Sequence, residues 1–133
     1  MQKTYTKEER AQYFQDLRNR WQAAKDLSQD NAILAAHQEA QTIAGRSFSV
    51  ASFADVERQL VDLKLSGTPY VDTKTYKAWR DSGMQVRKGE KSKITGLTWI
   101  KADDSKTDDD KKTSFTFPKE YHLFHSSQVQ PIE

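Results

Sequence analysis

The spacing of apolar residues changes once along this chain, from a helical period to a strand period. Up to about residue 82, apolar residues recur every three or four positions, as in the series Val56, Leu60 and Leu63. After Gly83 they fall in short runs rich in aromatic and β-branched residues, a pattern typical of strands. Helices followed by strands, without regular alternation, favour an α+β fold. We therefore predict N-terminal helices packed on a small antiparallel sheet formed by the C-terminal half.

Capping signals divide the helical part into four segments. Helices are predicted over residues 7–26, 29–44, 53–65 and 73–82, with Thr6, Ser28 and Ser52 as N-caps of the first three. Gly45 and Gly83 are the predicted stops of the second and fourth helices. Strands are predicted over residues 84–86, 97–101, 114–117 and 121–124. The Asp- and Lys-rich segment 102–112 is predicted to be a flexible, solvated loop between strands.

At 133 residues the chain is expected to form a single domain over residues 1–133, with an N-terminal helix extension over about 1–28. It contains no cysteine, so neither a disulfide framework nor a cysteine-based zinc site is available. The charged N-terminus lacks the apolar core of a secretory signal, and no apolar run approaches the roughly 18 residues of a membrane span. We therefore expect a soluble, intracellular and cytoplasmic protein without a membrane partner.

The sequence does not satisfy the known catalytic and metal-binding motifs. His37 begins a stretch similar to a zinc-protease helix, but the residue four positions later is Gln41 rather than histidine. His122 and His125 lack an apparent third ligand, and segment 102–112 lacks the glycine and distal glutamate of a calcium loop. Nucleophile elbows, phosphate loops and dinucleotide fingerprints do not occur in the sequence. The chain is therefore expected not to be an enzyme and to carry no metal or other cofactor.

Positive charge is concentrated in residues 74–93. This window holds seven lysines and arginines against two acidic residues, a net charge of +5, whereas the whole chain carries +2. Tyr76 and Trp79 lie beside the cluster, and a cationic surface with aromatic rings suits a phosphate backbone whose bases can stack. A lysine-rich hairpin is also typical of a solvated sheet edge, and Trp79 is more typical of a core residue. From the pattern alone, nucleic-acid binding and a plain charged surface are both open interpretations.

Three motifs occur in order along the chain. The most specific reads W-x3-G-x2-V-x-KGEK and consists of Trp79, Gly83, Val86, Lys88, Gly89, Glu90 and Lys91. The other two are the stretch with Phe48, Ser49, Ser52 and Gln59, and the run with Leu123, Phe124, His125, Gln128 and Val129. Together they resemble the ArdC-like N-terminal domain family, found in antirestriction and primase-type proteins of plasmids and phages. Ser52 stands where the family usually has Asn, and His125 where an acidic or amide residue is common. The resemblance covers about residues 45–130, the family-like core.

The resemblance implies sequence-nonspecific binding of single-stranded DNA and a link to mobile elements, through antirestriction or DNA transfer and replication. Larger members carry a second, zinc-metalloprotease-like domain, but this chain has no HExxH motif, so that activity is not expected in it. On this basis Val86 to Lys91 forms a tight turn in which Gly89 takes a positive φ. The basic residues expected to contact phosphates are Arg87, Lys88, Lys91, Lys93, Lys74, Lys77 and Arg80.

Other residues have supporting roles in this hypothesis. The candidates for base stacking are Tyr76, Trp99, Tyr121 and Phe117. Gln128 and Ser49 are expected either to hydrogen-bond within the groove or to hold the fold. The structural motif consists of Trp79, Gly83, Val86, Gly89 and Glu90, with Trp79 in the core and Glu90 orienting a neighbouring basic side chain or a backbone amide.

A protein-interaction module is the alternative function. Such a module would inhibit a host restriction or defence enzyme by direct contact, through the alanine-rich second helix or the Asp- and Lys-rich loop. The chain is also compatible with being one piece of a larger polypeptide, which fits either function. The sequence leaves the oligomeric state open.

Overall fold

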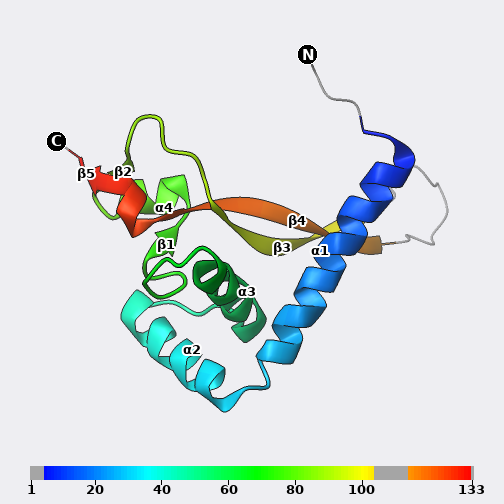
Figure 1. Cartoon of the computed structure of the whole chain (residues 1–133), viewed down its shortest axis with the longest axis horizontal. Helices are drawn as coiled ribbons and strands as arrows, with labels where there is room; N and C mark the ends of the chain where they lie inside the picture. Colours follow the sequence, from blue (N-terminus) through cyan, green and yellow to red (C-terminus); the bar gives the residue numbers. More distant parts are fainter. Residues whose placement is uncertain (1–4, 104–113, 133) are drawn as a thin grey trace.

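The computed structural model describes residues 5–103 and 114–132 and has the predicted α+β fold. Helices α1 (Lys7–Leu27), α2 (Asn31–Ala44) and α3 (Val50–Asp62) form the N-terminal half, and the short helix α4 (Tyr76–Asp81) follows. The strands are β1 (Thr73–Lys74), β2 (Met84–Val86), β3 (Ile94–Asp103), β4 (Ser114–His125) and β5 (Val129–Pro131), with a 3-10 turn, η1 (Ser126–Gln128), before the last. They form two antiparallel sheets, one ordered β1-β4-β3 and the other β2-β5 (Figure 1).

Helix α1 begins with the predicted capping box, whereas α2 begins at a different cap. The Thr6 hydroxyl accepts the backbone N–H of Glu9 at 3.1 Å, and the Glu9 side chain accepts the backbone N–H of Thr6 at 3.4 Å. Helix α2 is capped by Asp30, whose carboxylate accepts two backbone N–H groups of the first turn. Ser28 instead forms the C-cap of α1. The prediction of Ser28 as N-cap is wrong because the Asp30 carboxylate, two residues further on, accepts the free N–H groups of the first turn.

Helices α3 and α4 also start at positions that differ from the prediction. Ser49, not Ser52, caps α3, because its hydroxyl accepts the Ser52 N–H at 3.1 Å and donates to Ser52 Oγ at 2.7 Å. Thr75 caps α4, so the predicted start at residue 73 is wrong, and β1 instead pairs with β4. Gly83 follows the end of α4 with a φ of 86°, the left-handed conformation that a helix stop favours.

Strand β4 unites the two strands predicted over residues 114–117 and 121–124. It passes through Pro118, which pairs with Trp99 of β3. Among the described residues, the other edge of β4 is paired only near its end, with β1, so Pro118 has a strand neighbour on one side. Proline is tolerated at such an edge, and the predicted break is therefore wrong. Strand β3 begins earlier than predicted and reaches Asp103, and the rest of the predicted loop, 104–112, lies outside the described residues.

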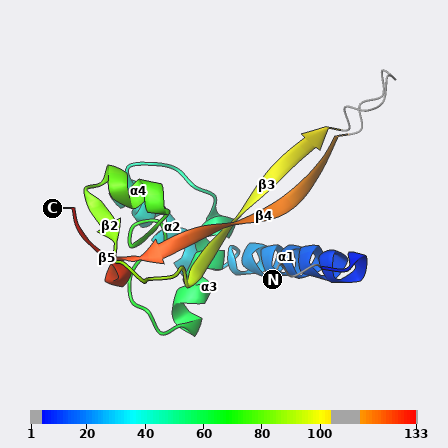
Figure 2. The same ribbon diagram turned by 90° about the horizontal axis from the view of Figure 1, so that it is seen from above.

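Helix α3 lies at the centre of the fold, in contact with α1, α2 and β3. Its Val56 and Leu60 pack with Tyr70 and with Ile94 and Leu123 of the strands to form the main core cluster. A second cluster joins α1 to α3 through small alanine side chains, which allow the two helices to approach closely. The β3–β4 hairpin extends away from this core, and α1 contacts both α3 and β4 (Figure 2).

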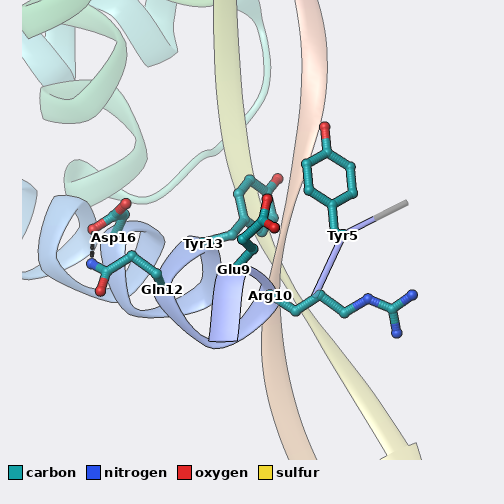
Figure 3. A pocket seen from close by; sticks show the side chains of 6 residues that line it. All are labelled: Tyr5, Glu9, Arg10, Gln12, Tyr13 and Asp16. Carbon is teal, nitrogen blue, oxygen red and sulfur yellow. Dashed lines mark hydrogen bonds between the residues drawn. The ribbon is translucent and has the colours of Figure 1, made fainter. Parts of the chain in front are cut away.

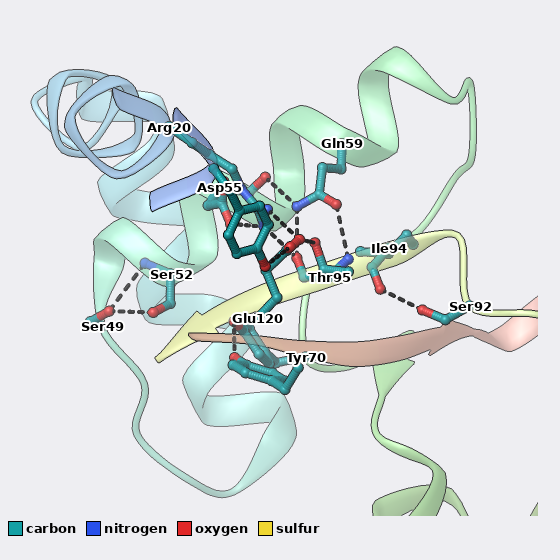
Figure 4. A network of polar contacts seen from close by, with 12 residues as sticks. Arg20, Ser49, Ser52, Asp55, Gln59, Tyr70, Ser92, Ile94, Thr95 and Glu120 are labelled. Carbon is teal, nitrogen blue, oxygen red and sulfur yellow. Dashed lines mark hydrogen bonds and ion pairs between the residues drawn. The ribbon is translucent and has the colours of Figure 1, made fainter. Parts of the chain in front are cut away.

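A network of polar contacts fixes α1 to α3 and to the hairpin (Figure 4). The Arg20 guanidinium donates to both carboxylate oxygens of Asp55 at 2.7 Å and to Glu120 at 3.1 Å. It also donates to the Thr95 carbonyl at 2.8 Å, which accepts a second hydrogen bond from the Gln59 amide. Asp55 is only 3% exposed, so its charge depends on Arg20 for compensation.

Candidate functional site

A tight basic turn connects β2 to β3. The Glu90 N–H donates to the Arg87 carbonyl at 3.1 Å, and Gly89 has a φ of 89°, which confirms the predicted turn and the positive φ. The Arg87 N–H donates to the Gln128 carbonyl at 2.9 Å, and β2 pairs with β5 directly before the turn. The start of the turn is therefore attached to the C-terminal part of the described chain.

Gln128 supports the turn through hydrogen bonds from its buried side chain. Its side chain is 2% exposed, and its amide nitrogen donates to the Lys91 carbonyl at 2.7 Å and to Glu90 Oε2 at 3.2 Å. Its amide oxygen accepts the His125 N–H at 3.0 Å. Glu90 in turn forms an ion pair with Arg87 at 3.7 Å, the orienting role expected of it. Gln128 therefore holds the fold rather than facing a groove.

The basic turn, α4 and β4 surround an open groove of about 700 Å³. Four of the predicted binding residues line it: Tyr76 and Lys77 from α4, Lys91 after the turn, and Tyr121 from β4. Both lysines are exposed, and neither forms an ion pair with a described residue. The fold thus brings two uncompensated cations and two phenol rings from separate elements to one hollow.

The two tyrosine rings of the groove differ in how freely they can contact a ligand. Tyr76 is 50% exposed, and its ring makes a T-shaped contact with the Phe124 ring at a centroid distance of 6.5 Å. Tyr121 is half-buried, and its hydroxyl lies 2.7 Å from the hydroxyl of Tyr70. Its ring lies against Gly96 of β3, where any side chain would collide with it. Tyr76 therefore offers the accessible stacking face, and Tyr121 forms part of the floor.

Four further residues line the groove and were missed in the sequence: Thr75, Ser92, His122 and Phe124. Thr75 is the N-cap of α4, and the Ser92 hydroxyl bonds to the Leu123 carbonyl at 2.8 Å. Strand alternation places His122 and Phe124 on one side of β4, a signal that the sequence contained once β4 is read as one strand.

The remaining basic residues of the window surround the groove without lining it. Lys88, Lys93 and Arg80 are exposed side chains of the turn and of α4. Arg87 is also exposed, but its guanidinium donates to the Ser127 carbonyl and pairs with Glu90. These residues add positive potential near the groove, with Arg87 partly neutralised by its carboxylate partner.

Lys74 and Trp79 lie away from the groove. The Trp79 ring is 6% exposed and its indole donates to the Phe124 carbonyl at 2.9 Å, which confirms the core position expected for it. The Lys74 ammonium lies 4.8 Å from the centroid of the Trp79 ring, in a different pocket.

Three more predicted residues also lie elsewhere, on or beside the helices. Trp99 packs against Trp21 of α1 at a centroid distance of 6.0 Å, and Phe117 packs against Phe14 of α1 at 6.2 Å. Both rings serve the contact between the hairpin and α1. Ser49 is the N-cap of α3 and so holds the fold.

A separate hollow of about 630 Å³ lies on α1, lined by Tyr5, Glu9, Arg10, Gln12, Tyr13 and Asp16 (Figure 3). Its two carboxylates against one guanidinium make it unsuited to phosphate. Within residues 5–103 and 114–132, no group of three or more His, Cys, Asp or Glu side chains could hold a metal ion. None of the helices in these ranges has both the length and the apolar character needed to cross a membrane.

Comparison with known proteins gives a match to a family model over part of the chain. The family model for the N-terminal domain of anti-restriction factor ArdC matches residues 66–124. This segment runs from before β1 to near the end of β4 and contains every residue that lines the groove. No curated protein and no solved structure matches the chain.

Proposed function

We propose that this chain, which matches the N-terminal domain of anti-restriction factor ArdC over residues 66–124, is a sequence-nonspecific module that binds single-stranded DNA. The match indicates an antirestriction-related function. We further propose that the protein belongs to a plasmid or phage system and acts in antirestriction or in DNA transfer and replication. Its role there is to bind DNA, without catalysis.

The observation that carries the proposal is the composition of the groove. Lys77 lies on α4 and Lys91 lies after the basic turn, and the half-exposed Tyr76 ring lies beside Lys77 on α4. Lysine ammonium groups contact phosphates as point charges, and a tyrosine face stacks on an unpaired base. This groove therefore combines cations for the phosphates and a ring for the bases, the two kinds of group that bind a single nucleic-acid strand.

The same groups explain why binding would not select a sequence. Ammonium contacts to phosphate carry no sequence information, and every base has a face that can stack. Lys88, Lys93 and Arg80 add positive potential around the groove, which raises the rate of encounter with a polyanion.

Charge removal from the groove tests the phosphate contacts. Each phosphate neutralised on a single strand contributes about 0.7 to the slope of log affinity against log salt concentration. The double variant Lys77→Gln/Lys91→Gln should therefore bind a labelled thymidine oligonucleotide more weakly and with a slope lower by about 1.4, measured by fluorescence anisotropy.

The matched control is Lys25→Gln/Lys119→Gln, which removes the same charge from exposed positions on α1 and in the hairpin. This control should keep the wild-type slope. Equal slopes for the two double variants would show that only net charge matters and would remove the groove from the proposal.

Tyr76 is tested separately, because its contribution is not electrostatic. Tyr76→Ala should lose the stacking of one base, worth about 1–3 kcal/mol, or roughly 5- to 150-fold in affinity. Tyr76→Phe keeps the ring and should bind within about threefold of the wild type. If both variants bind alike, stacking by this ring does not contribute.

A second candidate function, contact with a host restriction or defence protein, is favoured by the surface of α2. Ile43 is 61% exposed and borders a hollow of about 400 Å³ between α2 and α3, which the exposed Ala32 and Ala36 of α2 also line. Ala36→Glu should abolish capture of a defence protein from nuclease-treated lysate if this surface is used, and leave oligonucleotide binding intact, because Ala36 does not line the groove.

A further inference from the structure

A second pocket, of about 300 Å³, lies beside α4 and contains two cations. Arg46, from the loop after α2, and Lys74, from β1, both line it, together with Tyr70 and with Ala78 and Asp81 of α4. The two basic residues are far apart in the sequence, and only Lys74 belongs to the basic window. The fold therefore creates a cationic pocket that the sequence does not reveal.

Each cation of this pocket is held by an aromatic ring rather than by a carboxylate. The Arg46 guanidinium carbon lies 5.4 Å from the centroid of the Tyr70 ring, and the Lys74 ammonium lies 4.8 Å from that of Trp79. Neither cation forms an ion pair within the described part of the chain. A ring orients a cation but leaves its N–H groups free to donate to a ligand.

The charge of the pocket fits a single negative ligand. Arg46 and Lys74 contribute two positive charges, and Asp81 contributes one negative charge. The resulting net charge of about +1 complements a phosphodiester, which carries one negative charge per phosphate. Arginine in addition presents a planar set of donors that matches the oxygens of a phosphate.

We propose that Arg46 and Lys74 form a phosphate-binding subsite, occupied by a phosphodiester of the same strand whose base stacks on Tyr76. This proposal rests on the proposed function, because the groove supplies the rest of the strand. Lys74 directly precedes Thr75 of the groove, and α4 separates the two sites. A helix is about 10–12 Å wide, which about three nucleotides span at roughly 3.4 Å each.

The test compares thymidine oligonucleotides of about 2 and about 12 nucleotides, the longer one within the range of strand-binding site sizes. The longer one can reach both sites, whereas the shorter one cannot span α4 and occupies the groove alone. Arg46→Gln/Lys74→Gln should lower the salt slope for the longer oligonucleotide by about 1.4 and leave that for the shorter one unchanged. Lys77→Gln/Lys91→Gln should lower both slopes.

Three results separate the possible failures. If Arg46→Gln/Lys74→Gln leaves the long-oligonucleotide slope unchanged while Lys77→Gln/Lys91→Gln lowers it, the groove stands and the subsite is overturned. If the wild type binds neither oligonucleotide, the strand as occupant is overturned together with the proposed function. Inorganic pyrophosphate then tests the pocket directly, with the Arg46 and Ala78 amide signals in NMR spectra as the readout. Shifts of these signals in the wild type that are absent in Arg46→Gln/Lys74→Gln support a phosphate site. Unshifted signals in the wild type overturn it.

Discussion

Gly89 gives the basic turn its backbone path. Its φ of 89° lies in a region that other residues rarely adopt, and an added Cβ would meet no atom within 4 Å. The cost of a side chain at this position is therefore conformational rather than steric. Gly96 shows the opposite situation, because a side chain there would collide with the Tyr121 ring.

Replacement of Gly89 should reveal this conformational cost. Gly89→Ala should lower the free energy of unfolding by roughly 1–2 kcal/mol, measured by urea denaturation, because alanine is strained in the left-handed region. Gly89→Asn should lose less, since asparagine tolerates that region. Equal losses for the two variants would contradict backbone strain as the cause.

Individual site residues were predictable only where their function requires exposure. Lys77, Lys91 and Tyr76 belong to a charged, aromatic window that is evident in the sequence, and all three line the groove. Gln128 is polar too, yet it is buried beneath the turn. Its role depends on contacts with the chain 37 and 38 residues away, which local pattern does not encode.

At the level of elements, α1 is attached to the rest of the fold by ion pairs and hydrogen bonds as well as by apolar packing. Burial raises the pKa of Glu120, but hydrogen bonds from Tyr13 and Thr95 and the nearby Arg20 guanidinium outweigh it, so the pKa falls below its ordinary value of 4.5. The same contact acts on the phenol, because the hydrogen bond to Glu120, with burial, raises the pKa of Tyr13 to about 12. The contact between α1 and β4 is therefore strongest with Glu120 ionised and Tyr13 protonated.

Acidification should weaken this contact in a way that two glutamates distinguish. A lowered folded-state pKa means that Glu120 stabilises the fold above about pH 4.5 and that this stabilisation is lost as the pH falls. Burial instead raises the pKa of Glu57, so its ionised form destabilises the fold as the pH rises.

Urea unfolding from about pH 6 to about pH 3 should therefore give opposite changes. Glu120→Gln should flatten the loss of stability on acidification, and Glu57→Gln should make that loss steeper. A change of the same sign in both variants would contradict the assignment of these two environments.

The elements themselves were largely predictable, and the errors have physical causes. The helical period and the capping box located α1, and the strand over residues 84–86 is β2. Two strands were predicted where β4 is continuous, because Pro118 has a strand neighbour on only one side among the described residues and so interrupts no second ladder. The link between Arg20 and Asp55 could not be read from periodicity, because it depends on how two helices cross.

For the whole molecule, the distribution of charge matters more than its total. The net charge is +2, but the window over residues 74–93 carries +5, and two of its lysines, Lys77 and Lys91, line one groove. We expect a single-stranded oligonucleotide to bind more tightly than a duplex of equal length at the same salt concentration, because Tyr76 can stack only on an unpaired base.

Fluorescence anisotropy with both forms of the oligonucleotide measures this preference. Tyr76→Ala should bring the affinity for the single strand close to that for the duplex, since the cationic contacts remain. Equal binding of the two forms by the wild type would leave a plain cationic surface and no role for the ring.

The pairing of β2 with β5 has a mechanical consequence. Three residue pairs, from Met84 with Pro131 to Val86 with Val129, join the strand that leads into the basic turn to the last described strand. Tension applied beyond Pro131 would break these pairs one after another, starting with Met84 and Pro131. The segment that carries Lys91 would lose its support before the force reached the core residues Val56 and Leu123. Binding of a nucleic-acid strand in the groove would therefore be sensitive to force on that end of the chain.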